Sequence, residues 1–218
     1  MSGKWAPIES NPEVLTQWAG RVGLSTKLTA FSDVYGLDDE LLALVPQPVK
    51  AVLLVFPLTK EIDQARKRED QERTGATTSN AEEGGEAGGQ PNLDPTLFFI
   101  KQTVQLDPDE RAKLLESTSL FATAHADAAQ GGQSSLPRNL DTNEHFVAFV
   151  QAPDPTSDDG SQRRLVELDG RRPGPVDRGP STDLLKDAAK VIKEVYLGAT
   201  SALTFSMITM GPPSPFDD

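Results

Sequence analysis

Few side chains in this sequence could carry out covalent or metal chemistry. The chain contains no cysteine, so disulfides, thiolate zinc sites and thiol nucleophiles are all excluded. Its only imidazoles are His125 and His145, and neither belongs to the HExxH pattern of zinc proteases. We therefore expect neither a dedicated metal site nor a cofactor. The Gly pairs in residues 74–92 do not indicate a phosphate-binding loop, because no strand precedes them, no GK[ST] follows and the segment is acidic.

Taken singly, the remaining candidates have ordinary structural explanations. A histidine at the edge of a strand, such as His145, is more often half-buried than catalytic. The pair Asp169-Gly170 is typical of a turn, although a turn and a catalytic role are compatible. Gln102 in isolation carries no functional weight. A function for these residues must therefore be argued from the segments around them.

The strands predicted around these candidates are the strongest elements of the sequence. Residues 145–151 alternate apolar and polar side chains, and residues 164–168 are the predicted hairpin partner, joined by a polar connection. Residues 49–56 form an almost continuous apolar run with β-branched residues, which indicates a strand buried on both faces. We predict that this run is the central strand.

Other segments predict a mixture of helices and strands. Helices are expected at residues 12–22 and 38–44, from residue 107 to the loop at Gln130, and at 182–195 with Ser181 as the cap. Residues 59–73 are highly charged and predict a solvated helix. Further strands are expected at 28–34, 96–103 and 203–207. No repeating βαβ unit is present, so the predicted class is α+β. Residues 74–95 are predicted to be a flexible, Gly-rich acidic loop, because they hold too few large apolar side chains to order themselves.

Length and charge limit the possible partners. The 218 residues are expected to form a single domain, residues 1–218. The formal charge of -12 repels nucleic acid and anionic membranes and favours a basic partner. The first residues lack the apolar core of a secretory signal, and no run of about 18 apolar residues could span a membrane. We expect a cytoplasmic protein.

Six stretches, in order along the chain, resemble the ubiquitin carboxyl-terminal hydrolases, which are papain-like cysteine deubiquitinases. They are WAPIESNPEV, FSDVYGLDDELLALVPQPVKAVLLVFPLT, FFIKQT, LDPDERAKLL, EHFVAFV and ELDGRRPGPVDRG. The resemblance runs from Trp5 to about Val195. It implies a mainly antiparallel sheet between helices and a reaction that hydrolyses bonds to the terminal glycine of ubiquitin. The implied partner is ubiquitin or a ubiquitin-like protein, and the family precedent is a monomer.

The resemblance assigns roles to three of the candidates. His145 stands at the position of the general base, and Asp169 at that of the acid that orients it. Gln102 matches the residue that donates a hydrogen bond to the oxyanion. These are the roles of a thiol hydrolase, in which a cysteine thiolate attacks the substrate.

By the same resemblance, part of the surface would meet the substrate. Glu9, Glu13 and Asp33 would be among the acids that contact the basic C-terminal tail of ubiquitin, and a solvated acidic face is the alternative explanation. Residues 123–141, which include His125, resemble the crossover loop that passes over the active site in relatives and limits the size of the leaving group.

The nucleophile itself is missing. In relatives, the Gln-Thr pair leads within a few residues to an Asn-Ala-Cys-Gly stretch, whose Cys begins a long central helix. Here Gln102-Thr103-Val104 continues directly into Gln105-Leu106-Asp107-Pro108, which resembles a later segment of the family. The central helix is therefore expected to be missing too, and we expect no turnover.

Two interpretations of the missing segment stay open. The chain is either an incomplete copy of an active thiol hydrolase, or a pseudoenzyme that binds ubiquitin without cleaving it. The persistence of Gln102, His145 and Asp169 favours the first interpretation, and the acidic charge suits the second. Burial of one large apolar side chain contributes about 1.5 to 3 kcal/mol, against a total stability of about 5 to 15 kcal/mol. Loss of a central helix therefore predicts a chain that folds poorly or aggregates.

Overall fold

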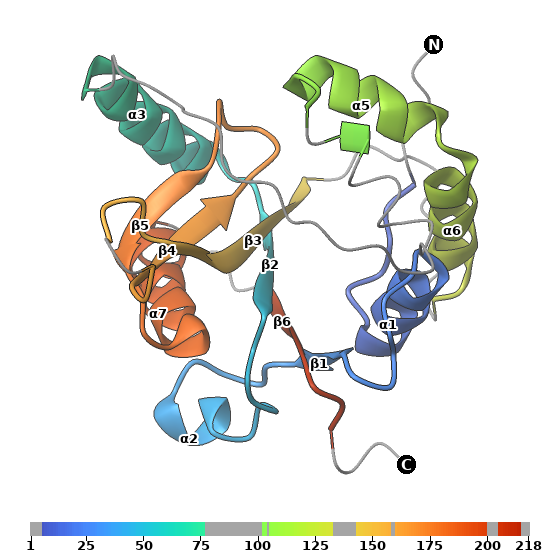
Figure 1. Cartoon of the computed structure of the whole chain (residues 1–218). Coiled ribbons are helices and arrows are strands. Elements are labelled where there is room, and N and C mark those ends of the chain that lie inside the picture. Colours follow the sequence, from blue (N-terminus) through green and yellow to red (C-terminus); the bar gives the residue numbers. More distant parts are fainter. Residues whose placement is uncertain are drawn as a thin grey trace. The chain divides into compact units, whose positions relative to one another are not determined.

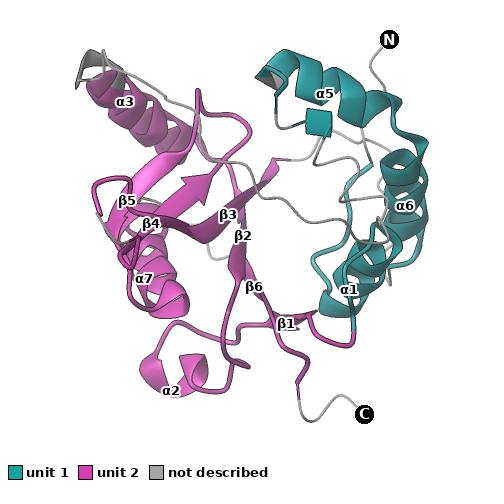
Figure 2. Cartoon of the chain, viewed as in Figure 1, with its two compact units in different colours: residues 1–26, 79–140 teal, residues 27–78, 141–218 magenta. Residues whose placement is uncertain are grey.

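The fold is seen in a computed structural model that describes residues 6–76, 102–103, 105–132, 143–157, 160–199 and 205–214 (Figure 1). The chain divides into two compact units (Figure 2). Unit 1 consists of residues 1–26 and 79–140, and unit 2 of residues 27–78 and 141–218. The single domain predicted over residues 1–218 stays a prediction. No helix in the described ranges is long and apolar enough to cross a membrane.

Unit 2 is built on one antiparallel sheet of six strands in the order β1-β6-β2-β3-β4-β5. The strands are β1 (Ala30–Asp33), β2 (Ala51–Pro57), β3 (Glu144–Pro153), β4 (Arg163–Leu168), β5 (Val176–Pro180) and β6 (Ser206–Gly211). The predicted central strand is β2, which pairs with β3 on one side and β6 on the other. The α+β class and the hairpin of β3 with β4 are confirmed.

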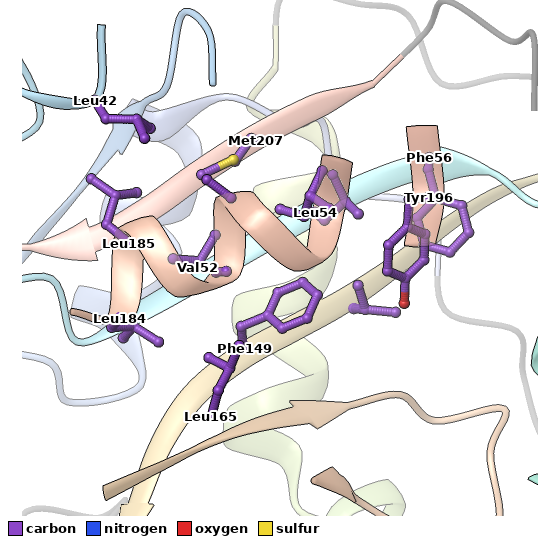
Figure 3. Packing of buried hydrophobic residues seen from close by; sticks show 14 of the residues in the cluster. Leu42, Val52, Leu54, Phe56, Phe149, Leu165, Leu184, Leu185, Tyr196 and Met207 are labelled. Carbon is purple, nitrogen blue, oxygen red and sulfur yellow. The ribbon is translucent and has the colours of Figure 1, made fainter. Parts of the chain in front are cut away.

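The core of unit 2 lies on one face of this sheet. Val52 and Leu54 of β2 lie opposite Phe149 and Val147 of β3, and all four are almost fully buried. Helix α7 (Leu184–Val191) covers them with an apolar face, and a π-helical turn, η1 (Ile192–Tyr196), continues it (Figure 3). A short 3-10 turn, η2 (Leu197–Ala199), ends this region. The β2 run thus has a packing partner on this face, and it is α7.

The start of α7 differs from the prediction. The N-cap is Asp183, whose carboxylate accepts a hydrogen bond from the backbone N of Lys186 at 3.1 Å. Ser181, the predicted cap, instead donates its hydroxyl to Asp187 at 2.8 Å. Asp187 also accepts from the backbone N of Thr182 at 3.0 Å. Ser181 was predicted wrongly because both Ser and Asp are good N-caps, and the spacing of the apolar residues does not distinguish between them.

Two further helices belong to unit 2. Helix α2 (Asp39–Leu42) is short and buries Leu42. Helix α3 (Lys60–Ala76) runs three residues into the predicted loop of residues 74–95, and the rest of that loop lies outside the described residues. Strand β5 was not predicted, because VDRGP has few strand-forming residues.

Unit 1 contains the helices α1 (Pro12–Arg21), α5 (Pro108–Ser117) and α6 (Ser119–Gln130). Asn11 caps α1 by accepting from the backbone N of Glu13 at 2.9 Å, as its sequence predicts. The helix expected from residue 107 to the loop at Gln130 is not a single one: the extended backbone of Thr118 divides it into α5 and α6. Its hydroxyl bonds to the carbonyl of Leu114 at 2.7 Å, which competes with helix continuation.

Three predictions fall partly outside the described residues. Helix α6 includes residues 123–130 of the predicted crossover loop, and residues 133–141 are not described. Of the strand expected at 96–103, only Gln102 and Thr103 are described, and they are helical. Of the strand expected at 203–207, the described part begins with Phe205, and β6 runs from Ser206.

Candidate active site

His145 and Asp169 are brought together by the register of two neighbouring strands. Leu168 ends β4 opposite Ala148 of β3. The next residue, Asp169, therefore lies diagonally across from His145 on the same face of the sheet. The imidazole Nε2 of His145 is 2.7 Å from Oδ1 of Asp169. This contact joins two of the three residues that the resemblance singles out.

The contact determines which imidazole nitrogen carries hydrogen. A carboxylate only accepts, so Nε2 must be the donor, and in the neutral ring the lone pair is then on Nδ1. An imidazole oriented in this way can accept a proton at Nδ1 while the carboxylate holds the opposite edge. This arrangement has the chemistry of a general base with its orienting acid.

The pair is withdrawn from water. The side chain of Asp169 is 0% exposed and that of His145 is 13% exposed. Phe56, directly opposite His145 on β2, meets the imidazole edge to face with ring centroids 5.5 Å apart. Burial, together with the nearby charges of Arg66 and Arg171, lowers the pKa of His145 from 6.5 to about 4. The imidazole is therefore neutral near pH 7.

Arg66 of α3 is a third member of this cluster. Its guanidinium forms an ion pair with Oδ2 of Asp169, the oxygen that His145 does not use. The Nη2 atom of Arg66 is also 3.4 Å from Nε2 of His145. The Arg66 side chain is 5% exposed, and burial lowers the pKa of its guanidinium. Sequence reasoning missed Arg66, because the highly charged residues 59–73 were interpreted as a solvated helix.

Gln102 is described within unit 1 only. It is exposed and lies in a helical turn. His145 and Asp169 belong to unit 2, so the predicted grouping of all three residues stays a prediction. Among the described residues, no group of three His, Asp or Glu side chains could hold a metal ion.

The predicted substrate-binding acids also divide between the units. Glu9 and Glu13 belong to unit 1, where Glu13 is exposed in the first turn of α1 and accepts a hydrogen bond from Gln17 at 3.2 Å. Asp33 ends β1 in unit 2 and is partly buried, which raises the pKa of its carboxyl. His125 of α6 is hydrogen-bonded through Nε2 to the carbonyl of Ala6 at 2.6 Å, so it holds the segment before α1.

Comparison with known proteins identifies the family. A family model described as ubiquitin carboxyl-terminal hydrolase, family 1, matches residues 5–106 and 90–196. Ubiquitin carboxyl-terminal hydrolase 3 of Arabidopsis thaliana is 35% identical, over 96% of this chain and 94% of that protein. The isozyme L1 of Homo sapiens is 34% identical, over 94% of this chain and 96% of that protein. The chain belongs to the ubiquitin carboxyl-terminal hydrolase family.

The fold agrees with this assignment. The crystal structure of the UCH37 catalytic domain of Trichinella spiralis, bound to ubiquitin vinyl methyl ester, is similar with a TM-score of 0.66. The match covers 97% of each chain at 22% identity. The alignment with the Arabidopsis relative spans 232 positions, whereas this chain has 218 residues. That relative therefore has residues with no counterpart in this chain.

Proposed function

We propose that this chain, with its present sequence, has the base and acid of a thiol hydrolase but not the hydrolase activity, and that it binds ubiquitin. The base and acid without hydrolase activity are supported by one observation: Nε2 of His145 lies 2.7 Å from Oδ1 of Asp169 in a chain without cysteine. The imidazole has a lone pair oriented to take a proton, and the sequence offers no thiol to supply it.

The roles proposed here follow the family resemblance. His145 is the general base, Asp169 fixes its tautomer, and Gln102 is the donor to the oxyanion. A serine or threonine hydroxyl would need stronger activation than a thiol, and the neutral imidazole of His145 is a weak base because its pKa is about 4. Substitution of the missing thiol by a hydroxyl is therefore not expected.

Turnover can be measured with ubiquitin that carries a fluorogenic amide at its C-terminal glycine. We expect release of the fluorophore at the rate of buffer alone, and no difference between the chain and its His145→Gln variant. Release that depends on enzyme concentration and is abolished by His145→Gln would show that a nucleophile other than cysteine is used, and the proposal would be wrong.

Ubiquitin binding is supported by charge and by a relative. The Trichinella spiralis domain was crystallised with a ubiquitin derivative, and the formal charge of -12 here favours a basic tail. Glu9, Glu13 and Asp33 are proposed to be among the acids that the tail meets. Because this attraction is electrostatic, it should weaken as salt is added.

A titration of labelled ubiquitin with the chain tests this binding by nuclear magnetic resonance. We expect the signals of the basic C-terminal tail of ubiquitin to shift as the chain is added. At the same concentration, the Glu13→Gln and Asp33→Asn variants of the chain should cause smaller shifts. Asp109→Asn, an exposed acid of α5 outside the proposed set, is the matched control and should behave as the unchanged chain does. Unshifted tail signals at high concentration would remove ubiquitin binding from the proposal.

A second candidate is an incomplete copy of an active enzyme. It is favoured by the alignment of 232 positions, since a relative with more residues than this chain fits a lost segment. The genomic sequence between the codons for Val104 and Gln105 tests it. A coding stretch with Asn-Ala-Cys-Gly there would establish the loss, and insertion of that segment should restore hydrolysis. An uninterrupted junction would favour the pseudoenzyme.

Three expectations about the setting remain proposals. We propose a monomer that resides in the cytoplasm and binds neither nucleic acid nor membrane, since its acidic charge repels both. The part of the predicted crossover loop after α6 ends at Gln130 is proposed to limit access to the site, and the part of residues 74–95 after α3 ends at Ala76 is proposed to be a flexible loop. Sedimentation of the purified chain at several concentrations tests the monomer.

A further inference from the structure

Helix α3 runs beside the segment that carries Asp169, and the two make contact step by step. Arg66 forms an ion pair with Asp169. One turn later, Asp70 accepts from Nε of Arg172 at 2.9 Å. A further turn on, Nη2 of Arg73 donates to the carbonyl of Pro175 at 2.9 Å. These three contacts join α3 to residues 169–175.

The spacing explains why the contacts repeat. Residues four and three apart on a helix share one face, so Arg66, Asp70 and Arg73 point the same way. Their partners are spaced by three residues, from 169 to 172 to 175, so each helical turn meets the next part of the segment. A polar face of α3 therefore matches the segment in register. Ile62, at the start of α3, is almost fully buried and belongs to the hydrophobic core of unit 2.

A buried carboxylate extends the contacts into the sheet. Glu167 of β4 is 0% exposed, and it accepts from Nη1 of Arg172 at 3.3 Å and from Nε of Arg178 at 2.8 Å. Glu69 of α3 accepts from Nη2 of Arg172 at 2.7 Å and also pairs with Arg178. Buried charges are tolerated only when each is paired with good geometry. The two arginines thus join α3, β4 and β5 with little freedom to move.

Within this framework both oxygens of Asp169 are engaged. Oδ1 accepts from His145 and, at 2.9 Å, from the backbone N of Arg171. Oδ2 faces the guanidinium of Arg66. If Arg66 were absent, a fully buried oxygen would lose its cation, and the carboxylate could rotate or take up a proton. Either change would release the imidazole.

We propose that α3 is a positioning element for the base and acid, and that Arg66 is the positioning residue through which it acts, by holding the carboxylate of Asp169 in the rotamer that binds Nε2 of His145. This inference rests on the proposed roles of His145 and Asp169. It adds that their geometry is imposed by a helix about a hundred residues earlier in the chain.

The chain has only two histidines, so the imidazole nitrogens can be observed directly by nuclear magnetic resonance after 15N labelling of histidine. His145→Gln identifies the signals by their disappearance. In the unchanged chain we expect hydrogen on Nε2 only. The charged groups facing His145 are Arg66 of α3 and, after β4, Asp169 and Arg171.

The deciding variant is Arg66→Gln. We expect His145 to populate both neutral tautomers, because the carboxylate of Asp169 no longer holds Nε2. Arg66→Lys should restore much of the unchanged pattern, since the cation remains. Arg68→Gln, an exposed arginine of the same helix, is the control and should change neither signal.

A second variant keeps the test decisive if Arg66→Gln does not fold. Asp70→Asn leaves Arg66 in place and weakens the next contact along the helix, so a smaller change of the His145 tautomers in the same direction is expected. A lower melting temperature with unchanged His145 signals, in either variant, would show that α3 is structural only and overturn the proposal. No ubiquitin and no turnover enter this measurement, so its failure is distinguishable from failure of the proposed function.

Discussion

Phe56 of β2 lies directly opposite His145 of β3, and the edge of one ring meets the face of the other, with centroids 5.5 Å apart. On its other side Phe56 packs against Tyr196 with centroids 4.8 Å apart. The aromatic ring is thus shared by the hydrophobic core and the candidate active site. Loss of this ring should affect both.

Phe56→Ala is expected to lower the free energy of unfolding by about 3 to 5 kcal/mol, since a buried aromatic side chain is replaced by a cavity. Denaturation by urea measures the change. Leu44→Ala is the control, because Leu44 is 70% exposed and its truncation should change stability by less than about 0.5 kcal/mol. Equal effects of the two variants would contradict the packing of Phe56.

Acid should destabilise the chain through His145. The folded pKa is about 4 and the ordinary value is 6.5, so below pH 6.5 the unfolded state binds a proton that the folded state does not. Stability is full above pH 6.5 and falls as the pH is lowered toward 4, by up to about 3 kcal/mol. The His145→Gln variant should lose this part of the pH dependence between pH 6.5 and 4.5, while His125→Gln should keep it.

Removal of the buried carboxylate of Glu167 should be costly. Glu167→Gln leaves Arg172 and Arg178 with one negative partner fewer in a buried place, and a loss of about 3 to 5 kcal/mol is expected. The control is Lys67→Gln, which removes an exposed ion pair with Asp63 and should cost at most about 1 kcal/mol. Thermal unfolding of both variants measures these losses of stability. A loss for Glu167→Gln no larger than that of the control would contradict the network of ion pairs.

The face of the sheet opposite α7 should govern solubility. Phe146 and Leu168 lie on that face and are 40% and 42% exposed. Exposed apolar groups of this size promote aggregation. We expect Phe146→Ser with Leu168→Ser to reduce light scattering on heating without lowering the urea midpoint. The chain was predicted from its sequence to fold poorly or aggregate; unchanged scattering would mean that this face is not responsible for any such aggregation.

The start of α7 supplies a comparison between Asp187, which accepts three hydrogen bonds there, and Ser181, which donates one of them. Asp187 accepts from the hydroxyl of Ser181 and from the backbone N of Thr182 and of Asp183, so Asp187→Ala should cost about 1 to 2 kcal/mol. Ser181→Ala removes one of these donors and should cost about 1 kcal/mol or less. A reversed order in chemical denaturation would contradict the central place of Asp187 in these contacts.

Local patterns predicted much of the sheet and part of the site. The apolar run of β2 and the alternation of β3 are signals that depend only on neighbouring residues, and both strands appear where expected. Strand β5 was missed because its pairing with β4, and the ion pairs of Arg178, come from tertiary structure. Thr118 was missed as a break, since a threonine within a helical pattern is only a weak signal.

The candidate site also combines residues that local sequence patterns predicted with one that depends on tertiary structure. His145 and Asp169 were recognised from the segments around them, and the strand register explains their meeting. Arg66 could not be found in this way. It stands in a run of charges typical of a solvated helix, and its partner Asp169 comes about a hundred residues later. A buried arginine is recognisable only when the carboxylate that it meets is known.

The order of the strands has a consequence for biosynthesis. Strand β6 is the last of the six strands to be synthesised, yet it lies between β1 and β2, the first two. A nascent chain therefore holds β1 and β2 unjoined until β6 has been made, and late closure of this kind leaves strand edges open to other chains. A stop codon before Ser206 would leave β1 without a neighbour and β2 with a bare edge.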